Sequence, residues 1–144
     1  MTISRILRDK GTEVVSVAPE DDAIAIARVL ARHGIGAALV RDDTGRILGI
    51  VSERDIVRAL ARDEAAAARL PATRLMTAVR HTVLPETRIT EALAKMTEER
   101  VRHLPVMEAE QRLIGIVSIG DLVKARIADA ENEASALRDY VTSA

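Results

Sequence analysis

Hydrophobic and polar positions follow the same series of spacings twice along this chain. Each series begins with a short β-branched stretch that ends at a proline, at residues 13–17 and again at 81–84. An apolar stripe with i, i+3, i+4, i+7 spacing follows, as on the buried face of a helix. The stripe positions are Ala23, Ile26, Ala27 and Leu30, then Ile89, Ala92, Leu93 and Met96. We expect Asp21 and Thr87 to be the N-caps of these two helices.

Two apolar runs separated by a polar turn complete each series. Residues 37–40 and ILGIVS (47–52) flank DDTGR in the first series, and residues 103–107 and LIGIVS (113–118) flank EAEQR in the second. This pattern predicts a hairpin of two strands. Ser52 and Ser118 then begin a second helix, so the predicted order in each series is strand, helix, strand, strand, helix.

The two series are copies of one another. GIVSERDIVRAL (49–60) and GIVSIGDLVKAR (115–126) match at seven of twelve positions with a constant offset of 66, and the same offset pairs residues 17–20 with 83–86. A shared register over this length indicates duplication. We therefore predict a mixed α/β (α+β) fold of two tandem β-α-β-β-α repeats, at 1–67 and 68–128. Neither repeat is long enough to bury a sufficient core alone.

A narrower apolar seam follows Asp121 and predicts a long last helix, with an extension at 129–144. Its positions alternate four and three residues apart: Val123, Ile127, Ala130, Ala134, Leu137 and Val141. Such a seam is typical of a helix that packs along a partner helix. Two interpretations remain open, self-association through the seam and packing of the helix on its own body.

Composition narrows the class of protein. Hydrophobic residues make up 48% and charged residues 30% of the 144, a globular balance, and no apolar run is long enough for a bilayer span. The absence of cysteine excludes disulfides and thiolate metal sites. A net charge of -1 argues against nucleic acid as a partner. Because the N-terminal MTISRILRDKG lacks an apolar signal-peptide core, we expect a cytoplasmic protein.

Catalytic patterns are missing from the sequence. His33, His81 and His103 are scattered, without the i, i+4 spacing of a metal-binding helix. Neither a Walker loop nor G-x-G-x-x-G occurs. With a single aromatic residue, Tyr140, any bound flat ring must lie between aliphatic side chains. We therefore expect a protein that is not an enzyme and needs no metal.

The repeated motif resembles a known family. The pattern G-h-V-[S/T]-x-x-D, where h is hydrophobic, occurs at 49–55 and 115–121, and RHLPV at 102–106 is similar to the family's middle strand. These residues resemble a pair of CBS domains, the module named after cystathionine β-synthase. The resemblance implies that the repeats pack with pseudo-twofold symmetry, and that AMP, ATP or NAD binds in clefts between them. It further implies a sensor that signals to a regulated partner, and a homodimer of four repeats.

The resemblance also assigns roles to particular residues. Asp55 and Asp121 would each accept hydrogen bonds from both ribose hydroxyls, and Ser52 and Ser118 would contact ribose or phosphate. Backbone groups would read adenine, at Ile35, Gly36 and Ala38 in the Asp121 cleft and at Val101, His103 and Leu104 in the Asp55 cleft. Arg54, Arg102 and His103 would make the Asp55 cleft cationic and suited to phosphate. The remaining expected ligand contacts precede the first strands of the repeats: Lys10, Thr12 and Thr77.

The same Ser-x-x-Asp spacing has a purely structural interpretation. A serine at the N-cap and a carboxylate three residues later form a capping box, in which each side chain accepts a backbone N–H of the other residue. Both roles can coexist at one helix start. If only the cap were real, the chain would be a structural homodimeric adaptor without a physiological ligand, and we keep that alternative.

Overall fold

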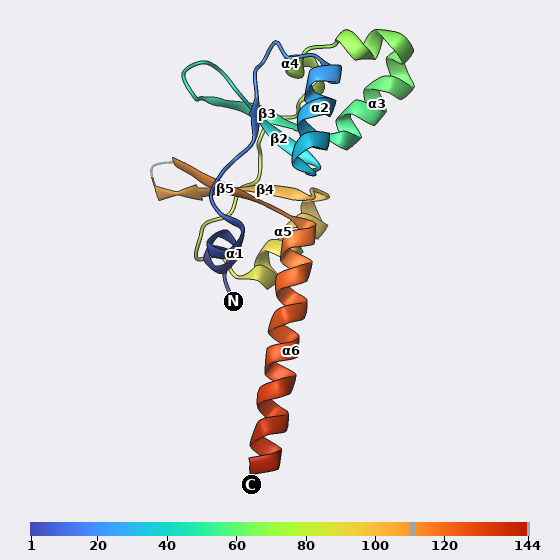
Figure 1. Ribbon diagram of the computed structural model, residues 1–144. Helices are drawn as coiled ribbons and strands as arrows, with labels where there is room; N and C mark the ends of the chain where they lie inside the picture. The colour runs from blue at the N-terminus through green and yellow to red at the C-terminus, as the bar shows by residue number, and fades with distance from the viewer. Residues whose placement is uncertain (110–111, 144) are drawn as a thin grey trace. The chain divides into compact units, whose positions relative to one another are not determined.

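The structure is a computed structural model that describes residues 1–109 and 112–143. Its elements, labelled in Figure 1, are α1 (Ile3–Lys10), β1 (Ser16–Val17), α2 (Ala23–His33), β2 (Ala37–Arg41), β3 (Ile47–Ser52), α3 (Glu53–Asp63), the 3-10 helix η1 (Glu64–Arg69), α4 (Ala72–Leu75), α5 (Ile89–Glu99), β4 (His103–Glu108), β5 (Arg112–Ser118) and α6 (Ile119–Ser143). The mixed α/β fold with two tandem repeats is confirmed. None of the helices in this described part combines the length and apolarity that crossing a membrane requires.

The chain forms two compact units that do not follow chain order. One unit is Val14–Arg80, and the other joins Met1–Glu13 to the chain from His81 onward. The first helix, α1, therefore belongs to the unit of the second repeat. The expected boundaries at 67 and 128 mark where the sequence repeats end. The compact units do not test them, so they stay a prediction.

The unit of residues 14–80 is built on a three-stranded sheet in the order β1-β2-β3. β1 pairs parallel with β2, and β2 pairs antiparallel with β3. Its core contains Val17, Ile26, Leu30, Val40 and Val51. The cap prediction for α2 was wrong by one residue: Asp22 caps the helix by accepting the Ala25 N–H at 2.9 Å. Asp21 instead accepts the Ala18 N–H at 2.9 Å and stabilises the preceding turn.

The other unit repeats this plan with a smaller sheet. β4 and β5 pair antiparallel, and the strand expected at 81–84 is reduced to one parallel bridge between Val83 and Val106. The cap prediction for α5 was also wrong by one residue, since Arg88 is its N-cap and the Thr87 hydroxyl accepts the Leu84 N–H at 3.0 Å. Of the predicted EAEQR turn, Glu110 and Gln111 lie outside the described residues.

The duplication is visible in the geometry of each unit. α2 spans 23–33 and α5 spans 89–99, the same limits shifted by 66, and both helices end in a left-handed residue, Gly34 and Arg100. Each unit also contains a helix that precedes the first strand of the other repeat. α1 lies in the unit of the second repeat, and α4 lies in the unit of the first. The Ile3 N–H at the start of α1 donates to the Thr87 carbonyl at 3.0 Å, and the Ala72 N–H at the start of α4 donates to the equivalent Asp21 carbonyl at 2.7 Å. α1 and α4 are thus counterparts.

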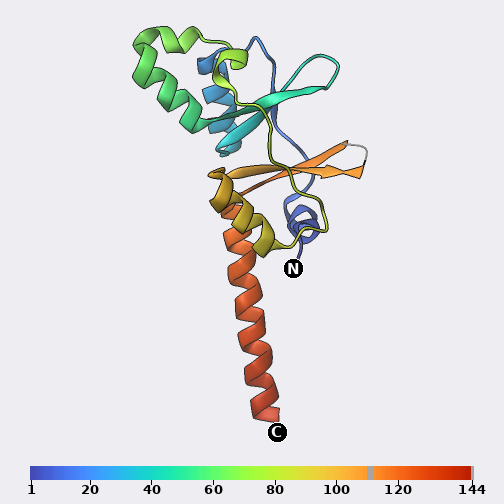
Figure 2. The ribbon, with the colours of Figure 1, turned by 180° about the vertical axis from the view of Figure 1, so that it is seen from behind.

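The long last helix is confirmed. Leu122, near its start, is fully buried in the core of its own unit together with Ile3 and Met96. Beyond residue 129 every described position of α6 is exposed. Figures 1 and 2 show this part of α6 running beyond α1 and α5, so the seam does not pack on the body of its own unit.

Candidate functional site

The first Ser-x-x-Asp motif lies where β3 passes directly into α3. The Ser52 N–H donates to Oδ2 of Asp55 at 2.8 Å, and the Ser52 hydroxyl lies 3.0 Å from the same oxygen. The Asp55 N–H donates to Oγ of Ser52 at 3.4 Å. Both halves of the predicted capping box are therefore present. Because the box fixes the first turn of α3, the Asp55 carboxylate has a defined position at the helix N-terminus.

The second motif repeats this arrangement where β5 passes into α6. The Ser118 N–H donates to Oδ2 of Asp121 at 2.9 Å, and the Asp121 N–H donates to Oγ of Ser118 at 3.1 Å. In both repeats, the hydrogen bonds that the aspartate carboxylate accepts within the cap involve only its Oδ2 atom. Capping therefore leaves Oδ1 for other donors, and the structural and ligand-binding interpretations are compatible.

The strand residues expected to contact adenine lie beside the motif of their own repeat. The Glu53 N–H donates to the Gly36 carbonyl at 3.0 Å, and the equivalent Ile119 N–H donates to the Arg102 carbonyl at 2.8 Å. Ile35, Gly36 and Ala38 thus adjoin Ser52, and Val101, His103 and Leu104 adjoin Ser118. Pairing of each set with the aspartate of the other repeat stays a prediction.

Burial limits what two of these strand residues could offer a ligand. Ala38 is 1% exposed and Leu104 is 0% exposed, and both side chains belong to the cores of their units. Only their backbone groups could reach a bound base. Ile35 and Gly36 are partly exposed and can offer a surface.

A lysine distinguishes the second motif from the first. Nζ of Lys10, at the end of α1, donates to Oδ2 of Asp121 at 2.7 Å and to the Ile116 carbonyl at 3.0 Å. Burial raises the pKa of Asp121, but the hydrogen bonds from Lys10 and Ser118 and the lysine charge outweigh it and leave that pKa below its ordinary value. α4, the counterpart of α1, has only four residues and offers Asp55 no equivalent of Lys10.

A cavity of about 350 Å³ opens beside the Lys10–Asp121 pair, between α1 and α6. Its charged and polar lining includes Arg5, Asp9 and Lys124 in addition to the pair itself. Sequence reasoning missed these three residues, because none of them belongs to the Ser-x-x-Asp motif and α1 gave no sign that it packs beside α6.

The other predicted polar residues are distributed over both units. Arg54 is exposed in the first turn of α3, and Arg102 is exposed just before β4, where His103 is partly buried. Whether these three come together stays a prediction. Thr12 is exposed between α1 and β1. Thr77 is exposed, but its backbone is occupied, since its N–H and carbonyl pair with Ile50 at 2.9 Å each.

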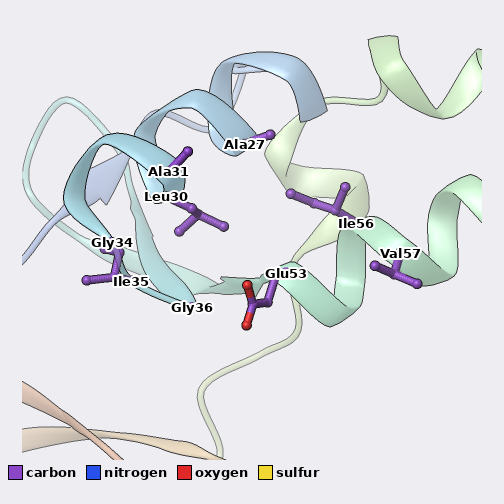
Figure 3. Close-up of a pocket in the computed structure, with 9 residues that line it drawn as sticks. All are labelled: Ala27, Leu30, Ala31, Gly34, Ile35, Gly36, Glu53, Ile56 and Val57. Carbon is purple, nitrogen blue, oxygen red and sulfur yellow. The ribbon is translucent and has the colours of Figure 1, made fainter.

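An apolar hollow of about 500 Å³ lies next to the first motif, between α2 and α3 (Figure 3). Leu30 and Ile56 form its walls, Ile35 and Gly36 line one end, and Glu53 supplies the charged group. The walls of this hollow are aliphatic, and the binding of a flat ring between aliphatic side chains stays a prediction. Within the described residues, no group of His, Asp and Glu is arranged to hold a metal ion.

Comparison with known proteins identifies the family of this geometry. The model of the CBS domain matches twice, at residues 4–62 and 72–128. The fold is similar to a CBS-domain containing protein from Agrobacterium tumefaciens, with a TM-score of 0.84, 39% identity, and coverage of 87% of this chain and 92% of that one.

Two further solved structures show the same fold. A protein with CBS domains from Burkholderia ambifaria has a TM-score of 0.82 and 40% identity, with coverage of 90% of this chain and 96% of that one. A CBS domain protein from Pyrobaculum aerophilum complexed with AMP has a TM-score of 0.73 and 28% identity, covering 84% and 89%. The doubled Ser-x-x-Asp motif and both family matches lead to one conclusion: the chain belongs to the CBS domain family, as a pair of CBS domains.

Proposed function

We propose that this chain is a regulatory module without catalytic activity of its own, which binds an adenosine-containing nucleotide such as AMP, ATP or NAD. Binding would shift its conformation, and a regulated protein, still to be identified, would respond to that shift. The shift can be no larger than the difference in affinity of the nucleotide for the two conformations allows. We further propose that the module works as a cytoplasmic homodimer of four repeats.

The observation that carries the proposal is the pair of equivalent carboxylates held at two helix starts. Asp55 and Asp121 occupy the same place in both units, each fixed through Oδ2 by its serine. A related CBS domain protein, 28% identical, is known in complex with AMP.

The chemistry of this arrangement suits a nucleotide. An ionised carboxylate accepts hydrogen bonds from the two adjacent ribose hydroxyls, and each charge-assisted bond contributes roughly 1.5 to 3 kcal/mol. The helix N-termini at the starts of α3 and α6 carry the positive ends of their dipoles, which favour a phosphate nearby. Ser52 and Ser118 lie next to both the carboxylates and the helix N-termini, and they would contact ribose or phosphate.

Lys10 would make the two motifs unequal. Because its ammonium already pairs with Asp121 at 2.7 Å, a nucleotide at Asp121 must share or displace it. A displaced ammonium is well placed to meet a phosphate. We therefore expect a nucleotide with a longer phosphate chain to gain more from Lys10 than AMP does.

One observation favours the alternative, a structural homodimeric adaptor without a ligand. The caps at both motifs are complete without any bound molecule, and Asp121 has a lysine in addition. On this alternative the aspartates serve stability alone.

Isothermal titration calorimetry with AMP, ATP and NAD separates the two functions. We expect binding by the parent chain and at least a tenfold weaker affinity in Asp55→Ala or Asp121→Ala, since roughly 1.4 kcal/mol corresponds to a factor of ten. Asp22→Ala is the matched control, because it removes the cap of α2 without touching either motif. Losing a cap costs about 1 kcal/mol in any of the three variants.

The outcomes are distinct. Weaker binding in the two motif variants, with parental binding in Asp22→Ala, supports the sensor. An absence of heat with all three nucleotides in the parent, or unchanged affinity in both motif variants, supports the adaptor.

A further inference from the structure

The distal part of α6 presents an apolar face that its own unit leaves uncovered. Val123 is 43% exposed, Ile127 55%, Leu137 65% and Val141 66%. Leu122, by contrast, is fully buried against the unit. Because neighbouring helical residues lie 100° apart, the buried and the exposed faces point in different directions. The uncovered face, which we call the α6 seam, consists of Val123, Ile127, Ala130, Ala134, Leu137 and Val141.

We propose that the α6 seam pairs with the same seam of a second copy of this chain, as a parallel two-stranded coiled coil in register. The seam keeps the alternating four and three residue spacing of a heptad repeat, with Ile127, Ala134 and Val141 at a positions. This inference takes the homodimer proposed above one step further, to the orientation of its two chains. It does not depend on nucleotide binding.

The charges beside the seam select the parallel orientation. In a parallel coiled coil, each g position faces the e position five residues later on the other helix. Arg126 at g would therefore face Glu131 of the second copy. Glu133, the next g position, would face Arg138 of the second copy. Both contacts join opposite charges, and each occurs twice by symmetry.

The antiparallel orientation with the same overlap brings like charges together. It would place Val123 opposite Val141, so Glu131 and Glu133 would each face their own copies. Lys124 would face Arg138. Every one of these contacts is repulsive, although large seam residues would still meet large ones. Side-chain size therefore does not decide between the orientations, and charge does.

A shorter antiparallel overlap would avoid this repulsion at the cost of apolar contact. Shifting the helices so that Ile127 lies opposite Ala130 brings Arg126 to Glu133 of the second copy. That register leaves Leu137 and Val141 uncovered, and both are at least 65% exposed. The parallel register is the one that satisfies both the seam and its charges.

Contacts within α6 do not oppose this pairing. Arg126 lies 3.9 Å from Asp129 on the same helix, a long and exposed pair that contributes little. Among the described residues of α6, Arg126–Asp129 is the ion pair that forms, and it involves neither Glu133 nor Arg138. Substitutions at Glu133 and Arg138 can therefore test the interhelical contact without breaking a salt bridge within α6.

Cysteine cross-linking tests the orientation, because the chain contains no cysteine of its own. In the parallel register Val141→Cys places each thiol against its copy, and we expect a disulfide-linked dimer under mild oxidation. In the full antiparallel register the two copies of residue 141 would be about 27 Å apart along the helix, far beyond the reach of a disulfide. Asp139→Cys is the matched control, an exposed f position on the outer face.

The proposal is overturned if Val141→Cys forms no linked dimer, or links no faster than Asp139→Cys. Either result would leave the α6 seam to another protein or to solvent.

Charge exchange in the full chain provides a second, independent test. We expect Glu133→Lys alone and Arg138→Glu alone to raise the dimer dissociation constant about tenfold each, and the double variant to return to within about threefold of the parent. Sedimentation equilibrium measures these constants. An antiparallel dimer would instead tighten in Arg138→Glu, which would then attract Lys124, and that result contradicts the proposal. Nucleotide titration of the same variants should match the parent, so failure here is distinguishable from failure of the sensor function.

Discussion

At the residue scale, the two motif aspartates have the same cap but different electrostatic surroundings. Oδ2 of Asp121 accepts hydrogen bonds from both the Ser118 N–H and Nζ of Lys10, a residue from the first helix of the chain. Its pKa is lowered despite burial, so the ionised carboxylate stabilises the folded state. Since the folded-state pKa is the lower one, this stabilisation is fully present above about pH 4 and is lost as the pH falls through the folded-state value.

Replacing Lys10 with methionine should reveal this contribution, because methionine keeps the length of the side chain without its charge. We expect the pKa of Asp121 to rise, since burial then acts with less opposition, and the free energy of unfolding at pH 7 to fall by about 1 kcal/mol. Carbon-detected NMR titration of Asp121 and urea unfolding at pH 7 and pH 3 measure both. Lys124→Met, which removes another ammonium from the same cavity, is the control. An Asp121 pKa identical in parent and Lys10→Met would contradict the account.

At the element scale, the glycine of each motif allows a helix-bearing segment to approach the sheet. A Cβ at Gly49 would lie 2.6 Å from the Thr77 carbonyl oxygen and 2.8 Å from Sδ of Met76, which follows α4. A Cβ at Gly115 would lie 2.7 Å from Cδ2 of Leu7 in α1. The repeated glycine therefore has a packing role that the motif pattern alone did not explain.

The two glycines should respond differently to substitution with alanine. Gly49→Ala should lower the free energy of unfolding by about 3 kcal/mol, because the clash is with backbone that two hydrogen bonds to Ile50 hold in place. Gly115→Ala should cost about 1 kcal/mol, since the end of the Leu7 side chain can rotate. Gly120→Ala, whose Cβ would approach nothing closer than 3.6 Å, should be neutral or slightly stabilising in its helix.

Urea unfolding of the three variants gives this ranking directly. Equal losses for Gly49→Ala and Gly115→Ala would mean that the backbone near Thr77 adjusts as easily as the Leu7 side chain.

Most elements of this fold could be predicted from the sequence, because duplication supplies each pattern twice. The apolar stripes correctly predicted helices at the positions of α2 and α5, but both N-caps were assigned one residue too early. Asp21 and Asp22 are equally good capping residues, and only the turn that claims Asp21 decides between them. The capping box at Ser52 was predicted correctly because its two residues are local.

Contacts between side chains far apart in the chain could not be predicted from the sequence. Lys10 was expected near a ligand, but its bond to Asp121 spans 111 positions and depends on where α1 packs. Nothing in the apolar stripe of α1 says which sheet it will cover, because an amphipathic helix fits either repeat. The seam of α6 left two interpretations open, self-association and packing on its own body. Its exposure within the described residues argues against the second, and self-association stays a prediction.

At the scale of the whole molecule, chain order and compact units disagree, and the disagreement has an energetic consequence. Ile3 is fully buried in the core that Met96, Leu104 and Val117 form, although more than ninety residues of sequence separate it from them. Residues 14–80 form their own core, in which Ile26 is equally buried. A cavity made at Ile3 should therefore weaken the distant second repeat and spare the adjacent first strand.

Hydrogen exchange of paired isoleucine variants tests this expectation. Ile3→Ala and Ile26→Ala each remove the same atoms from a site with no exposed surface, so each should cost about 2 to 5 kcal/mol. Ile3→Ala should speed amide exchange mainly in α5, β4 and β5, and Ile26→Ala mainly in α2, β2 and β3. Equal acceleration of both sets in both variants would show that the units open together. The contrast between the two variants then measures how far the N-terminal helix, though first in sequence, belongs energetically to the second repeat.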